Sequence, residues 1–191
     1  TKNEKIIFSD NAGNVIDSLT INFLTQTDHS YGRTNDGGNA WSIFTTPTPN
    51  ASNVGGINYY TEKPTFSLAP GFYAGAQNLS LSTSDASASI YYTLDGSIPT
   101  TASNLYATPI NIATTTAVRA RSFSSDPNTP ASFIETNTYF IDITHGIPVI
   151  SIVDNRYCII SYYLHLYLQF FIYLHLLNGI LHLHQPVILL L

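Results

Sequence analysis

The stretch that decides the fold of this chain is Ile90-Tyr91-Tyr92-Thr93-Leu94-Asp95-Gly96-Ser97-Ile98-Pro99-Thr100. Its first half consists mostly of aromatic and β-branched residues, which favour β-strands. Asp95-Gly96 then supplies the residue types of a tight turn. Pro99 cannot donate a backbone hydrogen bond, so it disfavours a central strand at that point. The stretch therefore predicts a strand that enters a tight turn.

Similar strand signals recur throughout residues 69–143. Asn78-Leu79-Ser80-Leu81-Ser82 alternates apolar and polar residues with the period of a half-buried strand. In the run 115–123, the period of two places Val118 and Ala120 on one face and Arg119 and Arg121 on the other. Further strands are expected at 104–106, 109–112 and 132–140. Short strands at this spacing, without a helical period, predict an all-β fold, an immunoglobulin-like antiparallel β-sandwich.

This region resembles a known family module. The motif Tyr91-Tyr92-Thr93-Leu94-Asp95-Gly96-Ser97, followed by Asn104-Leu105-Tyr106 and Arg119-Ala120-Arg121, is similar to the C-terminal module of chitobiases and β-hexosaminidases. The resemblance covers residues 69–143 almost end to end. It implies a non-catalytic β-sandwich of the kind that many secreted bacterial proteins carry.

Residues 1–53 resemble the C-terminal part of the lamin-tail domain. The resemblance is carried by the turn Asn11-Ala12-Gly13-Asn14, the corner Ser30-Tyr31-Gly32-Arg33, Trp41 and the run Thr48-Pro49-Asn50. The opening strands of that family have no counterpart in this chain, so we expect an incomplete N-terminal sandwich with an uncovered apolar face. Residues 54–68, which contain Val54-Gly55-Gly56 and Pro64, are interpreted as a linker.

Residues 144–155 contain Ile147-Pro148-Val149-Ile150-Ser151-Ile152-Val153, which resembles the first strand of the CotH-type kinase domain. The apolar tail, residues 156–191, has no charged residue after Arg156. Three interpretations of this tail are open. It is long enough for a membrane segment, although polar residues recur in it. His182 and His184 would share one face of a strand and could hold a metal. Alternatively, translation has shifted out of frame near Asn155.

The composition excludes some classes of function. The chain has 191 residues, with 12 acidic and 7 basic residues and a formal charge of −5. Without a basic patch, nucleic-acid binding is disfavoured. A single cysteine, Cys158, rules out an internal disulfide framework. Only 10% of the residues are charged while Thr, Ser and Asn are abundant, which suits an extracellular or cell-surface protein. Because the chain contains no methionine, we expect a fragment of a longer protein whose export signal lies upstream.

Tyr92 and Asp95 are the candidate carbohydrate contacts. An exposed tyrosine could stack on a sugar ring, but Tyr91 and Tyr92 point to opposite faces of one strand, so one of them belongs to the core. Asp95 could bind a ligand or a cation, or it could cap its own turn. Trp41 is interpreted as a packing anchor and Arg33 as a residue that secures a loop.

No arrangement of residues indicates catalysis. The neighbours Asp28-His29-Ser30 cannot converge as a triad on an extended chain. A glycosidase would need two carboxylates facing one cleft, and the sequence shows no such pair. We therefore expect no catalytic residues, no cofactor and no metal.

The sequence thus predicts a non-catalytic accessory module that acts as a spacer, a docking face or a weak carbohydrate contact. Its expected partners are polysaccharide or cell-surface glycan and other domains of the same parent chain; a membrane is a partner only if the tail is genuine. One alternative is the N-terminal accessory region of a CotH-type kinase whose catalytic domain is missing from this chain. Another is a dedicated carbohydrate-binding module.

Overall fold

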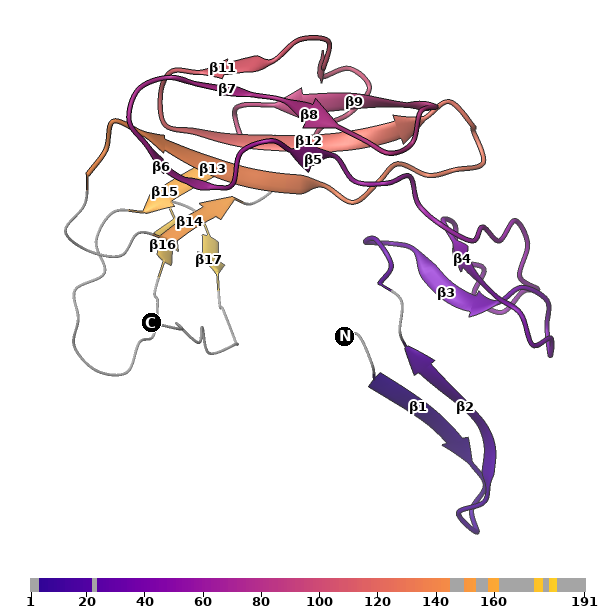
Figure 1. The fold of residues 1–191 in the computed structure, drawn as a ribbon. Helices are drawn as coiled ribbons and strands as arrows, with labels where there is room; N and C mark the ends of the chain where they lie inside the picture. Colours follow the sequence, from indigo (N-terminus) through magenta and orange to yellow (C-terminus); the bar gives the residue numbers. More distant parts are fainter. Residues whose placement is uncertain are drawn as a thin grey trace.

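The computed structural model describes residues 4–21, 24–144, 150–153, 158–161, 174–176 and 179–181 (Figure 1). Every regular element in these ranges is a β-strand, which confirms the predicted all-β class. Helices long and apolar enough to cross a membrane are absent from the described residues. Most of the tail, including His182, His184 and the junction at Asn155, lies outside the described residues.

One layer of the sandwich is a five-stranded sheet with the order β10-β9-β12-β13-β6. The pairs are antiparallel except β13–β6, which is parallel, with Tyr139 opposite Gly71. The central strand β12 is also the longest strand of this sheet, and it pairs with β9 on one side and with β13 on the other. The strands are β10 (Asn104–Leu105), β9 (Ala88–Thr93), β12 (Thr116–Ser124), β13 (Glu135–Ile141) and β6 (Gly71–Tyr73).

The second layer lies over this sheet (Figure 1). In it β11 (Ile110–Ile112) pairs with β7 (Gln77–Leu79), and β5 (Thr65–Phe66) pairs with β8 (Leu81–Ser82). Ser80 separates β7 from β8, and its backbone exchanges hydrogen bonds with Ser67. Strand β5 comes from the end of the expected linker, so the sandwich begins earlier than residue 69.

The core lies between the two layers. Its side chains come from both sheets and are Leu79, Leu81, Ile90, Ile110, Ile112, Val118, Ala120, Tyr139 and Ile141. Val118 and Ala120 share one face of β12, as their period of two predicts. The structure shows that this face is turned to the core. Each fully buried aliphatic side chain of this kind contributes about 1.5–3 kcal/mol relative to an exposed one. Burial of alternate side chains therefore holds the layers together without a disulfide.

Two hairpins precede the sandwich: β1 (Glu4–Ser9) pairs with β2 (Val15–Ile21), and β3 (Ser30–Arg33) pairs with β4 (Trp41–Phe44). The β1–β2 hairpin extends away from the sandwich (Figure 1). Its apolar side chains are uncovered, as predicted, and Phe8 on β1 is 63% exposed.

Arg33 joins these hairpins. Its guanidinium donates to Asp17 on β2 at 2.7 Å and to the carbonyl of Gly38, and it lies 5.1 Å from the ring centre of Trp41. The interpretation of Arg33 as a loop-securing residue is thereby confirmed. Trp41 stacks on Tyr31 with 5.5 Å between ring centres, so its ring is used in local packing.

Candidate functional site

The Asp95 loop follows strand β9 and lines an open hollow of about 440 Å³ together with Ser97 and Asn104. One carboxylate oxygen of Asp95 accepts hydrogen bonds from the Ser97 backbone N–H at 3.0 Å and from the Ser97 hydroxyl at 2.6 Å. These two bonds also lower the pKa of Asp95. The interpretation that Asp95 caps its own turn is confirmed.

The turn is further tied to the five-stranded sheet. Gly96 adopts a φ of 81°, a left-handed conformation that glycine reaches without a steric penalty. Its carbonyl accepts a hydrogen bond from the buried guanidinium of Arg119 at 2.7 Å. The Thr93 hydroxyl donates to the carbonyl of Ser97, also at 2.7 Å. The Asp95 loop is therefore a rigid structural corner.

Tyr92 and Asp95 do not line this hollow together. Tyr92 is partly buried and packs against the core cluster. Tyr91 lies on the other face of β9, where its ring meets Phe123 edge-on with 5.4 Å between centres. A carbohydrate contact at Tyr92 and Asp95 thus stays a prediction, and the packing of Tyr92 leaves only part of its ring accessible.

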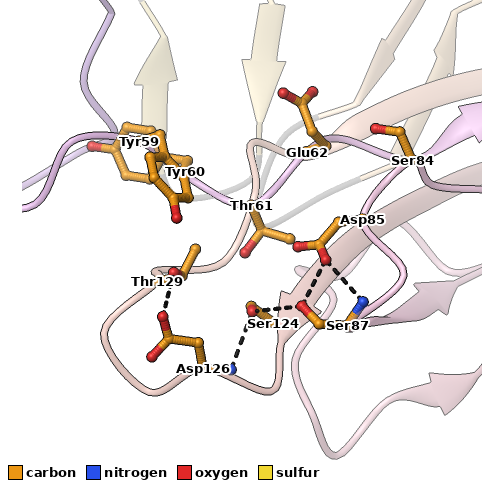
Figure 2. Close-up of a pocket in the computed structure, with 10 residues that line it drawn as sticks. All are labelled: Tyr59, Tyr60, Thr61, Glu62, Ser84, Asp85, Ser87, Ser124, Asp126 and Thr129. Carbon is orange, nitrogen blue, oxygen red and sulfur yellow. Dashed lines mark hydrogen bonds between the residues drawn. The ribbon is translucent and has the colours of Figure 1, made fainter.

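A second hollow, of about 370 Å³, lies where the chain enters the sandwich (Figure 2). Thr61 fixes its position, because the backbone and hydroxyl of Thr61 donate to the carbonyl of Pro130 at 2.9 and 2.8 Å. Its lining combines tyrosine, hydroxyl and carboxylate side chains: Tyr59, Tyr60, Thr61, Glu62, Ser84, Asp85, Ser87, Ser124, Asp126 and Thr129. We call this the Tyr59 hollow.

A chain of hydrogen bonds runs along the Tyr59 hollow (Figure 2). The Ser87 hydroxyl donates to Asp85 at 2.6 Å and lies 3.2 Å from the Ser124 hydroxyl. Ser124 accepts from the backbone of Asp126 at 3.1 Å, and Asp126 accepts from the Thr129 hydroxyl at 3.1 Å. These acceptors are thus held in place before any ligand arrives.

The chemistry of the Tyr59 hollow is that of an acceptor surface. Hydrogen bonds, first that from the Asn128 backbone, lower the pKa of Asp126, so its carboxylate is charged at neutral pH. A general acid for glycoside cleavage needs the opposite shift. The lining contains no lysine or arginine. Within the part of the chain that the structure describes, no group of three or more His, Cys, Asp or Glu residues could hold a metal.

A third hollow, of about 620 Å³, lies between residues 25–29 and the β12–β13 connection. We call it the Arg121 hollow. Burial lowers the pKa of Arg121, and burial together with the neighbouring Arg121 charge lowers the pKa of His29. The ring nitrogen Nδ1 of His29 lies 2.8 Å from the Tyr60 hydroxyl. The structure thus pairs the His29 ring with a tyrosine hydroxyl.

Sequence reasoning found neither the Tyr59 hollow nor the Arg121 hollow. Their lining residues come from segments that are up to about a hundred positions apart in the chain, as Gln26 and Arg121 illustrate. No spacing motif connects such segments. The sequence offered only one indication of these hollows, a mixture of tyrosine, hydroxyl and acidic residues. That mixture occurs along much of the chain, so it does not single out either hollow.

The family model described as chitobiase/beta-hexosaminidase C-terminal domain matches residues 68–134. The matched range runs from the β5–β6 connection to the residue before β13, so it contains most of the sandwich. No curated protein and no solved structure matches the chain. The match indicates a carbohydrate-associated β-sandwich module over these residues, which is compatible with a non-catalytic unit.

Proposed function

We propose that this chain is a non-catalytic accessory module that contacts polysaccharide and belongs to a secreted or cell-surface bacterial protein. The observation that carries this proposal is the Tyr59 hollow, where an exposed aromatic ring lies beside fixed carboxylate and hydroxyl groups. Tyr59 is 63% exposed. The similarity of residues 68–134 to a domain found in glycosidases supports the same conclusion.

The groups of the Tyr59 hollow match the chemistry of a neutral sugar. Sugar hydroxyls can donate to Asp85, Asp126 and Glu62, and an aromatic face packs well against the C–H groups of a sugar ring. The absence of cations from the lining disfavours acidic glycans at this hollow. Hydrogen bonds to charged groups contribute about 1.5–3 kcal/mol each before the cost of association, so a single site of this size binds in about the millimolar range.

Retention of the chain on insoluble chitin and cellulose tests this proposal. Tyr59→Ala is expected to abolish retention. The matched control is Phe8→Ala, because Phe8 is an aromatic residue with the same exposed fraction, 63%, on the distant β1–β2 hairpin. Failure of the unaltered chain to be retained on either polymer would refute the proposal. Equal losses in both variants would place the contact outside the Tyr59 hollow.

A second proposal concerns the parent protein: residues 1–53 are the end of a lamin-tail-like domain and residues 144–155 begin a CotH-type kinase domain. The uncovered apolar side chains of the β1–β2 hairpin support an incomplete N-terminal unit. Strand β14 (Ile150–Val153) follows the sandwich closely, and the Ser151 hydroxyl lies 2.7 Å from that of Thr138. In the coding DNA, the other reading frames after Asn155 should then encode kinase-like sequence. Stop codons in every frame would contradict this proposal.

A further inference from the structure

We propose that the Arg121 hollow binds the carboxylate of an acidic sugar, with the Arg121 guanidinium as the group that holds it. This inference rests on the proposed polysaccharide contact and adds a second site with its own ligand class. The two sites differ in charge: the lining of the Arg121 hollow contains Arg121 and His29 but no aspartate or glutamate.

Arg121 is held in place by neutral acceptors. Its Nε donates to the carbonyl of Ser132 at 2.7 Å, and its Nη2 donates to the side-chain oxygen of Gln26. Its guanidinium also lies 5.6 Å from the ring centre of Phe123. These contacts fix the orientation of the planar group and use only part of its five donors.

No carboxylate among the described residues pairs with Arg121. By contrast, two other cationic side chains form ion pairs in the described structure: Arg33 with Asp17, and Lys63 with Glu135. A partly buried guanidinium without a counter-ion is costly, because neutral acceptors replace only part of its hydration. Burial lowers the pKa of Arg121, which reflects the same cost. An anionic ligand that reaches the hollow would offset it.

The remaining lining of the Arg121 hollow favours a sugar as the carrier of that carboxylate. The polar side chains of Thr25 and Thr27 can meet ring hydroxyls, while Ile98 and Phe133 offer apolar surface to the C–H groups. One guanidinium without a lysine matches one negative charge, which favours a carboxylate over a doubly charged phosphate. A volume of about 620 Å³ is within the usual size of ligand pockets.

The walls of the hollow are preformed. The Tyr60 ring stacks on His29 with 5.6 Å between centres and meets Phe133 edge-on at 5.1 Å. The Gln26 side chain also donates to the carbonyl of Ala131 at 2.7 Å. Both sides of the hollow are therefore connected before a ligand binds, which reduces the ordering cost of binding.

Titration of the 191-residue chain with D-glucuronate tests the inference, with D-glucose and acetate as comparison ligands. The readouts are calorimetric affinity and the NMR signals of the His29 ring. We expect glucuronate to bind and to shift the His29 signals, and we expect glucose and acetate to bind at least tenfold more weakly. Arg121→Lys keeps the charge but loses the planar fork, so it should weaken glucuronate binding about tenfold or more.

Thr27→Glu provides an independent variant, because Thr27 is an exposed turn residue and its replacement brings a competing carboxylate to the hollow. It should also weaken binding about tenfold, and it decides the question if Arg121→Lys fails to fold. Arg33→Lys is the matched control, since Arg33 already pairs with Asp17, and it should bind glucuronate normally.

Three results would overturn the inference: no glucuronate binding, equal binding of acetate, or unchanged glucuronate affinity in Thr27→Glu. Retention on chitin or cellulose without glucuronate binding would refute the Arg121 site alone. Glucuronate binding that depends on Arg121, without retention on the neutral polymers, would refute the Tyr59 contact alone.

Discussion

The hydroxyl of Tyr139 is a polar anchor inside an otherwise apolar core. Tyr139 on β13 is 0% exposed. Its hydroxyl donates to the carbonyl of Leu68 at 3.0 Å and accepts from the side-chain amide of Asn137 at 3.3 Å. Tyr139→Phe preserves the ring but leaves both partners without this hydroxyl. We expect the free energy of unfolding to fall by about 1–2 kcal/mol at pH 7.

The same substitution should change the response to alkaline pH. Burial raises the pKa of Tyr139 above its ordinary value of 10.0. The folded state therefore holds this proton more tightly than the unfolded state, and the associated stability is complete below pH 10 and lost as the pH rises through the folded-state pKa. Phenylalanine has no such proton. The stability gap between the unaltered chain and Tyr139→Phe should narrow above pH 10.

Urea unfolding at pH 7 and pH 10.5, followed by far-UV circular dichroism, measures both effects. Fluorescence is unsuitable for the sandwich, because the single tryptophan, Trp41, lies on β4. Tyr106→Phe is the control: the Tyr106 ring also packs against the core, and no hydrogen bond of its hydroxyl occurs among the described residues. An unchanged midpoint for Tyr139→Phe at pH 7, or a gap that widens at pH 10.5, would refute the reasoning.

Two further substitutions have predictable effects on stability. Ser122 is 0% exposed, and its hydroxyl has no hydrogen-bond partner in the described structure. Ser122→Ala should therefore raise the free energy of unfolding by about 1 kcal/mol, which would be measured as a higher urea midpoint. Asp95→Ala removes the acceptor for Ser97 and should lower the free energy of unfolding by about 0.5–1 kcal/mol. Hydrogen bonds lower the pKa of Asp95, so its contribution to stability is present above about pH 4 and is lost as the pH falls through the folded-state pKa. Asp95→Ala should therefore lose less stability on acidification than the unaltered chain. An equal loss of stability in the two proteins between about pH 5 and pH 3, measured by thermal melts, would contradict this.

Local chemistry in the sequence determined the main strands and one corner of the sandwich. The period of two placed Val118 and Ala120 on the same face of their strand, because successive side chains of a strand point to opposite faces. The position of the second layer made that face the inner one. Asp95-Gly96 specified its turn, because the hydrogen bonds to Ser97 and the left-handed backbone of Gly96 need only neighbouring residues. Short strands such as β5 and β6 were not predicted, because two or three residues have no measurable period and their pairing is set by distant partners.

Only the tertiary structure decided which of Tyr91 and Tyr92 packs on the core and which polar groups meet in the hollows. Alternation predicts that the two rings point apart, but the direction of each depends on where the second layer lies. Likewise, Arg121 meets Gln26 through chain segments with no shared motif. Patterns of adjacent residues determine strands and turns, because those depend on local backbone chemistry. Binding surfaces depend on contacts between segments that only folding brings together.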